Sequence, residues 1–440
     1  MADEHEGVKT GEEMPVRRMT VLTLPTLGFS AAYSIVVTLL PLFLIRILGE
    51  DNPNSGLLIG FVVGGEGLFC ALLPLWVGVQ SDRIWTSRWG RRRPFMIYSA
   101  PFMAAALMLS PFQPGYVSIA VSTFLFFAAY HFYSSPYQSL LADVTPPTHH
   151  GRVPGYQAAM RGVGMFMGMV VSVFLYGVWE PLPFLLCGLL ILVVTFLTVS
   201  RVDEPEPVVP NGRARASVWR DMGHIWRMTF KNRTMRRFMA AAFLWEGTLG
   251  AIRPFVMAYF TYTLGASANQ AGTLMVVVGI MYVVAGLGGG YVADRFGRAR
   301  VMRIGLWIYL GGAILAMFMD SVNWAYAALP VFGLGGAVVL TLPFGILMGI
   351  MPKENVGGFT AMFSMVRGLA NVVAPLLAGW ATDAARSVLV NTEYSLDRRW
   401  AAIWVVCALM IAISLFLFRG TGKEKAETAI RSAGTEVLEA

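Results

Sequence analysis

The chain has 440 residues, of which 56% are hydrophobic and only 14% are charged, and its mean hydropathy is +0.60. Soluble domains usually carry about 25% charged residues, so this composition excludes an ordinary water-soluble protein and indicates a chain solvated by lipid. A net charge of +8 would also suit a nucleic-acid-binding protein. Most of the basic residues, however, lie in short segments between apolar runs, which favours a membrane and argues against a nucleic-acid partner.

Apolar runs of spanning length recur along the whole chain. A helix that crosses a bilayer needs about 20 mostly apolar residues, and the continuous runs lack the alternation typical of a β-barrel. The sequence therefore predicts an all-α membrane protein with twelve transmembrane helices. In chain order the runs are 22–47, 56–80, 94–112, 116–141, 153–177, 182–200, 236–263, 271–293, 301–319, 324–350, 358–383 and 400–418.

The distribution of Lys and Arg predicts the orientation. If the N-terminus is cytoplasmic, the predicted inner segments carry 27 basic residues and the predicted outer loops carry 3. Because basic residues are retained on the cytoplasmic side, both termini are expected there, in a multi-pass protein of the plasma (cytoplasmic) membrane. The polar N-terminus does not resemble a cleaved signal peptide.

The chain divides into two halves that resemble each other. GVQSDR (78–83) recurs as GYVADR (290–295), and each copy precedes a basic Gly-Arg cluster. Pro146, Gly151, Arg161 and Gly162 recur 206 residues later as Pro352, Gly357, Arg367 and Gly368. Duplication of this kind predicts two pseudo-symmetric six-helix bundles with the substrate site between them, near the bilayer midplane.

Five regions follow from this division. Trp219, Met222, Trp226 and Phe230 recur at spacings of three and four residues, which predicts an amphipathic helix in the linker. The regions are a cytoplasmic tail (1–20), an N-terminal bundle (21–200), the cytoplasmic linker (201–235), a C-terminal bundle (236–418) and a second cytoplasmic tail (419–440).

The loop between the second and third runs carries a family resemblance. Gly-x-x-x-Asp-Arg followed by a Gly-Arg cluster resembles the loop signature of the major facilitator superfamily, and both halves have it. SDRIWTSRWGRRRPF (81–95) and PYQSLLADVTPPTHHGR (136–152) look like the corresponding segments of the sucrose:proton symporters and of the related glycoside–pentoside–hexuronide:cation symporters. The resemblance implies a secondary active transporter, with a sugar or glycoside as substrate.

One position departs from that group. Its melibiose-type members carry an aspartate directly before a proline on the second helix, whereas this chain has Leu73 before Pro74, and Glu66 is the one acid in that run. Sodium binding by paired aspartates therefore does not carry over. A proton is the expected coupling ion.

Ionisable residues near the middle of a membrane helix are costly and mark functional candidates. Counting about 1.5 Å per residue from the nearer helix end places five of them near the midplane: Glu66, His131, Arg161, Glu246 and Arg367.

Glu66 and Glu246 are the candidate proton carriers, because a desolvated carboxyl at this depth can load and release a proton near physiological pH. The alternative is a permanent Glu–Arg ion pair that braces helices. Arg161, Arg367 and Arg253 are candidates for binding substrate oxygens or balancing the glutamates. For Arg161 and Arg367, which both halves keep, a generic structural role is the alternative, and His131 either exchanges protons or only packs. Aromatic residues that are candidates for stacking on a sugar ring are Tyr33, Tyr130, Tyr133, Trp245 and Tyr259.

A second set of residues predicts a gate at the cytoplasmic side. A carboxylate that follows the second or eighth run can cap a facing helix or pair with its basic residues, which would hold the inner side shut. The predicted gate residues are Asp82, Arg83, Gly90, Arg91, Asp143, Asp294, Arg295 and Arg298.

The sequence contains no catalytic signature, so no enzymatic activity is expected. Cys70, Cys187 and Cys407 lie in apolar runs without metal-ligand spacing, and neither a metal nor an organic cofactor is predicted. The leading hypothesis is a monomeric symporter of protons and a sugar or glycoside that works by alternating access. Proton-coupled export of drugs or metabolites is the alternative; exporters often carry Gly-x-x-x-Gly-Pro on helix 5, whereas GVGMFMGMVV (162–171) lacks the proline. A non-transporting membrane assembly factor is the third possibility.

Overall fold

The computed structural model is helical in its described part, and the one β-bridge there joins Thr86 to Gly90. The prediction of an all-α protein is confirmed. The chain forms two compact units, one of residues 1–36 and 72–212 and the other of residues 37–71 and 213–440. The described residues are 14–49, 52–83, 86, 89–146, 152–202, 204, 226–227, 229–350, 356–390 and 395–419.

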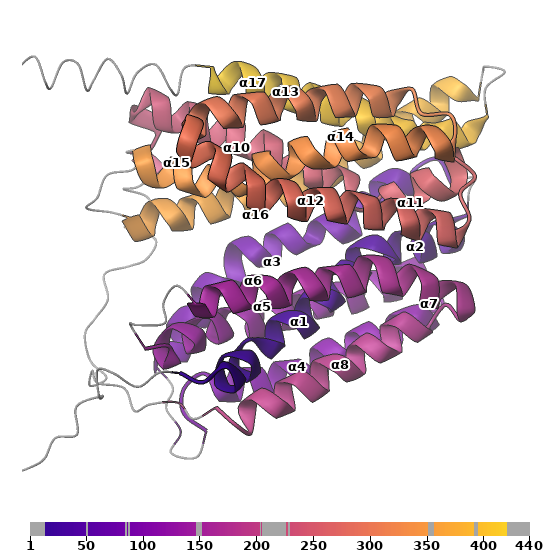
Figure 1. The fold of residues 1–440 in the computed structure, drawn as a ribbon. Helices are drawn as coiled ribbons and strands as arrows, with labels where there is room; N and C mark the ends of the chain where they lie inside the picture. Colours follow the sequence, from indigo (N-terminus) through magenta and orange to yellow (C-terminus); the bar gives the residue numbers. More distant parts are fainter. Residues whose placement is uncertain are drawn as a thin grey trace, which may run out of the picture. The chain divides into compact units, whose positions relative to one another are not determined.

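Unit 1 contains α1, the second part of α3 and the helices α4 to α8. In it α4 packs against both α5 and α8 (Figure 1). Its elements are α1 (Val16–Thr38) up to Val36, α3 (Ser55–Arg83) from Leu72 onward, α4 (Arg93–Leu109), η1 (Ser110–Phe112), α5 (Tyr116–Val144), α6 (Arg152–Phe166), η3 (Met167–Val171), α7 (Ser172–Val178) and α8 (Leu182–Val199).

Unit 2 contains α2, the first part of α3 and the helices from α10 onward. In it α14 packs against α12 and α13, and α16 packs against α10. Its elements are α2 (Leu40–Leu48), α3 up to Ala71, α10 (Arg233–Ile252), α11 (Val256–Ala258), η4 (Tyr259–Thr263), α12 (Ala268–Phe296), α13 (Arg298–Met317), α14 (Val322–Thr341), α15 (Pro343–Ile350), α16 (Val356–Leu389), η6 (Leu396–Ala401) and α17 (Ala402–Phe418). The boundaries of the two predicted bundles stay a prediction.

Ten helical segments in the described part are long and apolar enough to cross a membrane. The predicted runs 236–263 and 271–293 are also helical, as α10 to η4 and as α12, but they are not among the ten. Three arginines in the first turns of α10, together with Glu246, interrupt its apolar surface. The count of twelve spans therefore stays a prediction.

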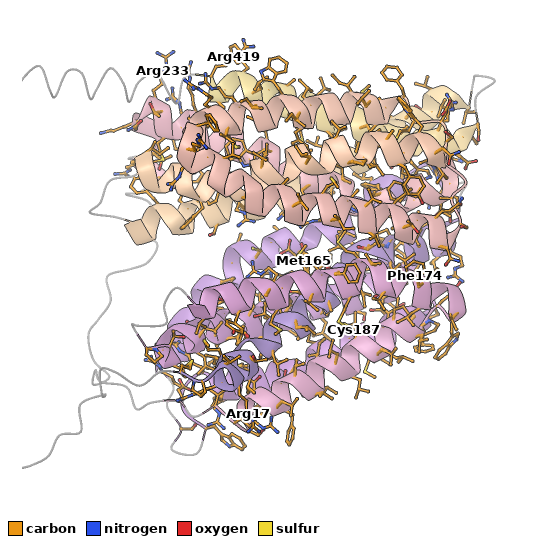
Figure 2. The ribbon with its side chains drawn as sticks, in the orientation of Figure 1. Arg17, Met165, Phe174, Cys187, Arg233 and Arg419 are labelled. Carbon is orange, nitrogen blue, oxygen red and sulfur yellow. The ribbon has the colours of Figure 1, made fainter. Side chains whose placement is uncertain are left out.

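Large apolar side chains cover the outer surfaces of the helices. Phe196, Phe416 and Trp380 are 72%, 69% and 63% exposed, and many similar side chains project outward in Figure 2. Exposed aromatic residues at this density would make a water-soluble protein aggregate. Together with the ten apolar helices, they indicate that lipid covers these faces.

The helices are interrupted where the backbone loses regular hydrogen bonds. The predicted run 22–47 forms two helices, because Pro41 has no N–H to donate and the chain turns at Leu39. The segments Met167–Val171 and Tyr259–Thr263 are π-helical, a local irregularity that often accompanies functional helices.

Candidate functional site

Unit 2 holds an ion pair between α10 and α16, Glu246 with Arg367, which is called the charged centre below. Glu246 Oε1 lies 3.0 Å from Arg367 Nε; the glutamate side chain is 6% exposed and that of the arginine is 52% exposed. Small residues bring the two helices close, because Gly247 faces Ala374 and Gly250 faces Asn371. The guanidinium thus pairs with Glu246 and lies 5.9 Å from the centroid of the Phe363 ring, while about half of the arginine side chain stays exposed.

Glu66 enters the same region from α3. It is buried, with 6% of its surface exposed. A Cβ on the following residue, Gly67, would lie 2.3 Å from the carbonyl oxygen of Gly368, so the α3 backbone touches the residue next to Arg367. Cys70, one turn further along α3, interacts electrostatically with both Glu66 and Arg367. Two carboxyl groups and one guanidinium are thus gathered in one part of unit 2.

Cys70 was not predicted to belong to this group, because a cysteine in an apolar run reads as a packing residue. The signal available in the sequence was its position one helical turn after Glu66.

The aromatic candidates of unit 1 form a cluster around α1 and α5. The rings of Tyr33 and Tyr130 have centroids 5.7 Å apart, and both residues are half-buried. His131 is 5% exposed, with its ring edge-on to Tyr130 at 5.0 Å. Tyr133 is fully buried, and its hydroxyl shares a 2.9 Å hydrogen bond with Thr195. Tyr33 and Tyr130 therefore have more accessible faces than Tyr133.

The remaining predicted substrate residues lie in different surroundings. Arg161 is exposed in this structure. Trp245 is fully buried edge-on against Phe238 and Phe418. Tyr259 is also fully buried, and its hydroxyl donates to the carbonyl oxygen of Met319 at 3.3 Å.

Arg253 is half-buried at the C-terminal cap of α10. The direct partner of Glu246 is Arg367, from another helix.

The predicted gate of the first half is organised by a carboxylate that the sequence analysis missed. Glu204 accepts hydrogen bonds from the backbone N–H groups of Arg91 (3.1 Å) and Arg92 (2.9 Å). Gly90 has a φ of 73°, and a Cβ there would collide with this carboxylate. Asp143 pairs with Arg91 at 2.7 Å and with Arg92 at 3.3 Å, and Arg92 also donates to the Ser81 hydroxyl.

Glu204 lies beyond the end of α8, outside the spanning segments. Burial raises the pKa of its carboxyl above the ordinary value of 4.5, and the N–H groups of Arg92, Arg93 and Arg91 partly offset that rise. The sequence signal was an acidic group directly after the sixth apolar run, in VDEPEP.

The other gate residues are only partly described. α3 extends to Arg83 and α12 to Phe296, but the side chains of Asp82, Arg83 and Asp294 lie outside the described part of the chain. Arg298 donates to the carbonyl oxygen of Gly345 at 3.2 Å, and Arg295 lies over the Phe296 ring. The latch expected for the two aspartates stays a prediction.

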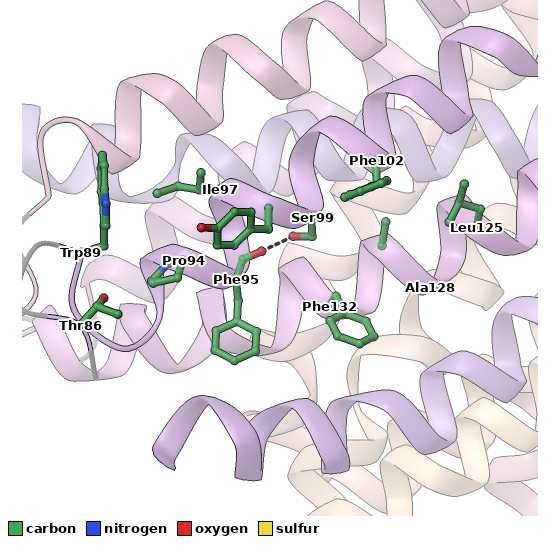
Figure 3. A pocket seen from close by; sticks show the side chains of 12 residues that line it. Thr86, Trp89, Pro94, Phe95, Ile97, Ser99, Phe102, Leu125, Ala128 and Phe132 are labelled. Carbon is green, nitrogen blue, oxygen red and sulfur yellow. Dashed lines mark hydrogen bonds between the residues drawn. The ribbon is translucent and has the colours of Figure 1, made fainter. Parts of the chain in front are cut away.

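A groove of about 760 Å³ lies on unit 1, along α4, α5 and the segment before α4 (Figure 3). Its lining is mainly aromatic and aliphatic, and the hydroxyls of Thr86 and Ser99 are engaged by the carbonyl oxygens of Gly90 and Phe95. Tyr98 and Phe102 in the lining are 72% and 59% exposed, so the groove opens on an apolar outer face. It does not offer the charged groups that the charged centre offers to a polar solute.

Comparison with known proteins agrees with this architecture. Multidrug resistance protein 3 of Bacillus subtilis (strain 168) is 33% identical over 107 residues, which are 23% of this chain and 21% of that protein. The chain thus spans about a fifth of that curated relative. The crystal structure of the nucleoside transporter NupG has a TM-score of 0.72 at 16% identity, covering 92% of this chain and 99% of that one. A D-xylose–proton symporter has a TM-score of 0.68 at 16% identity, covering 90% and 97%.

These structures are similar in fold alone, because their sequences are distant. The model of the Major Facilitator Superfamily, in contrast, matches residues 22–263 and 247–439. These matches cover nearly the whole chain, and with the apolar helices they show that the protein is a multi-pass membrane protein that belongs to the Major Facilitator Superfamily.

Proposed function

We propose that this transporter couples the movement of a small polar solute to protons, with Glu246 as the proton carrier. The observation that carries the proposal is the 3.0 Å contact between Glu246 and Arg367 within apolar helices. A carboxylate buried in a membrane protein needs a positive partner or a proton. Its partner Arg367 keeps 52% of its side chain exposed, so the guanidinium is also accessible to a solute.

The pair couples the two binding events through Arg367. When Glu246 is ionised, it competes with a solute for the guanidinium. When Glu246 takes up a proton, the attraction is lost and Arg367 becomes available to oxygen atoms of the solute. Proton binding therefore favours solute binding, and by linkage the solute favours proton binding. Glu66, close to the same arginine, is the second candidate carrier.

A sugar or glycoside is the first substrate class to test, with uptake as the direction and the plasma membrane as the location. The support is the resemblance of 81–95 and 136–152 to sugar symporters, together with the accessible ring faces of Tyr33 and Tyr130. Sugar rings present apolar faces that stack on aromatic side chains and hydroxyls that bind charged groups.

Proton-coupled export of drugs or metabolites is the alternative, and a specific contact favours it. Gly164 and Gly168 of the fifth run pack against the carbonyl oxygens of Leu27 and Ala31 on α1. This spacing matches the first part of the Gly-x-x-x-Gly-Pro pattern of exporters, although Met169 stands where that pattern has proline, and one relative is named a multidrug resistance protein. Loading of a fluorescent drug into everted vesicles in response to a proton gradient, without sugar transport, would favour export.

The test of the leading proposal is Glu246→Gln in proteoliposomes with labelled sucrose, maltose and other glycosides. The amide mimics the protonated carboxyl, so substrate-for-substrate counterflow should continue while accumulation driven by a pH gradient is lost. Asp320→Asn, which changes an exposed carboxylate between α13 and α14, is the matched control and should accumulate substrate normally.

The same assays on Glu66→Gln assign the carrier. Loss of accumulation with Glu66→Gln alone would move the role to α3. Normal accumulation by both variants would overturn proton coupling through these glutamates.

A further inference from the structure

The first turn of α3 is bound by a carboxylate from α16. Asp383 Oδ1 accepts the N–H of Gly56 at 2.9 Å, and its Oδ2 accepts the N–H of Leu57 at 2.8 Å. The first N–H groups of a helix have no partner within the helix and carry partial positive charge. Asp383 thus satisfies two of them at once and binds α3 to α16 by charge-assisted hydrogen bonds.

From this clamp, a row of glycines continues the contact along both helices. Gly56, Gly60, Gly64 and Gly67 form the glycine row of α3, at spacings of four, four and three residues. A Cβ on Gly60 would lie 2.3 Å from the carbonyl oxygen of Pro375, and one on Gly56 would lie 2.5 Å from that of Gly379. The absence of side chains lets the two backbones touch, as small residues do in membrane helix pairs.

The glycine row ends beside the charged centre. Gly67 touches Gly368, and these two residues directly follow Glu66 and Arg367 in the sequence. With the clamp at one end and this contact at the other, the register between α3 and α16 fixes where Glu66 stands relative to Arg367. Arg386 and Arg399 interact electrostatically with Asp383.

We propose that Asp383 is a positioning residue for proton coupling: its two hydrogen bonds to the start of α3 hold the glycine row against α16 and so keep Glu66 beside Arg367. The inference rests on the proposed function, in which Glu66 is a candidate proton carrier. The mechanical part, a clamp at residue 383 that controls packing near residue 66, can be measured without transport.

The experiment measures maleimide labelling in detergent, where membrane orientation does not matter. Two reporters are used in a background with Cys187→Ala and Cys407→Ala. Native Cys70 reports on the charged centre. Ser55→Cys, combined with Cys70→Ala, reports on the clamp; Ser55 is fully buried, and its hydroxyl has no hydrogen-bond partner within the described part of the chain.

Asp383→Asn should raise the labelling rate about tenfold at Ser55→Cys and at least threefold at Cys70. A tenfold change corresponds to about 1.4 kcal/mol. Asp383→Glu keeps the charge and should restore most of the protection. Asp397→Asn alters another carboxylate of unit 2, whose Oδ2 accepts a hydrogen bond from the Ser395 hydroxyl at 3.0 Å, and should change neither rate.

Unchanged labelling at both reporters would overturn the clamp. A change at Ser55→Cys without one at Cys70 would show that Asp383 supports the helix end alone, and the positioning role would fail. If both rates respond while Glu246→Gln and Glu66→Gln accumulate substrate normally, the positioning geometry stands and the proton-coupling proposal fails.

Discussion

Glu246 and Arg367 depend on each other for their stability in a membrane interior. Removing an ion from water costs several kcal/mol unless a partner of opposite charge compensates. The glutamate is almost completely buried, whereas the arginine keeps 52% of its side chain exposed. Loss of the arginine should therefore be more harmful than loss of the glutamate charge.

This asymmetry gives a stability prediction. Arg367→Ala leaves a buried carboxylate without its partner and should destabilise the protein by about 2 kcal/mol, less than a fully buried pair would lose. Adding Glu246→Gln removes the stranded charge and should restore part of the loss. Thermal unfolding in detergent measures both. A double variant no more stable than Arg367→Ala would contradict the pairing.

Glu204 gives a pH prediction. Because burial raises its pKa above 4.5 in the folded protein, ionisation costs more in the folded state than in the unfolded state. The stability that this group contributes is greatest below pH 4.5 and is lost as pH rises through the folded pKa. As the pH rises from about 4 to 7, the melting temperature of the wild type should therefore fall relative to that of Glu204→Gln. A relative rise would mean that the hydrogen bonds from the backbone N–H groups lower the pKa of Glu204 by more than burial raises it.

At the residue scale, the sequence pointed to the charged centre but not to its partners. Glu246 and Arg367 stand out because charges are rare in apolar runs, and a bracing ion pair between glutamate and arginine was one of the two alternatives left open. Asp383 was overlooked at the last position of a predicted run. Its role, like that of Cys70, depends on helices about 300 residues apart in the sequence, which local patterns do not reveal.

At the element scale, the contact between α3 and α16 depends on the missing side chains of the glycine row. A Cβ on Gly67 would lie 2.3 Å from the carbonyl oxygen of Gly368 and 2.5 Å from Val372 Cγ2. Neither helix can absorb this overlap by rotating one flexible side chain, because the nearest atom belongs to the backbone. The helices must separate.

Gly67→Ala should therefore destabilise the protein by about 1–3 kcal/mol, the usual cost of overpacking, and should reduce transport. Gly311→Ala is the matched control, because a Cβ at that position on α13 has nothing within 4 Å and alanine favours a helix. Melting temperature and counterflow should be measured for both. Equal effects of the two substitutions would refute the close packing inferred for α3.

Helix positions followed the sequence closely, but helix irregularities did not. Hydrophobicity alone places α4, α5 and α17 near the predicted runs 94–112, 116–141 and 400–418, because length and apolarity are local properties. The turn at Leu39 and the π-helical segments depend on packing as well as on proline. Of the linker helix predicted around Trp219, the described part includes Trp226 and Phe230, whose rings lie 4.9 Å apart.

At the scale of the whole molecule, residues at equivalent positions of the duplicated sequence have different surroundings. Arg161 and Arg367 hold equivalent positions in the repeat and both are exposed, but Arg367 pairs with Glu246, whereas Arg161 interacts electrostatically with Tyr137. The repeat therefore predicts architecture more reliably than it predicts chemistry. The two halves share their helix pattern, and the proposed proton chemistry belongs to unit 2.

Charge distribution predicts how the whole molecule crosses the bilayer. In unit 2, Arg233 at the start of α10 and Arg419 at the end of α17 lie at the same end (Figure 2), and the side of the membrane that this end faces stays a prediction. Each Lys or Arg near an anionic inner leaflet contributes about 1 kcal/mol to its retention there. The predicted inner segments carry 27 basic residues and the predicted outer loops carry 3, and this difference should fix the orientation.

Epitope tags at 205–215 and in the C-terminal tail should therefore be cytoplasmic, and a tag at 388–394 should be external. In intact cells, antibodies should reach the third tag alone; after permeabilisation, they should reach all three, which controls for tags hidden by folding. Because reversal would carry most of the basic residues across the membrane, a mixed population is not expected. External labelling of the 205–215 tag would contradict the predicted orientation, and opposite sides for the 205–215 and C-terminal tags would contradict an even number of spans after the linker.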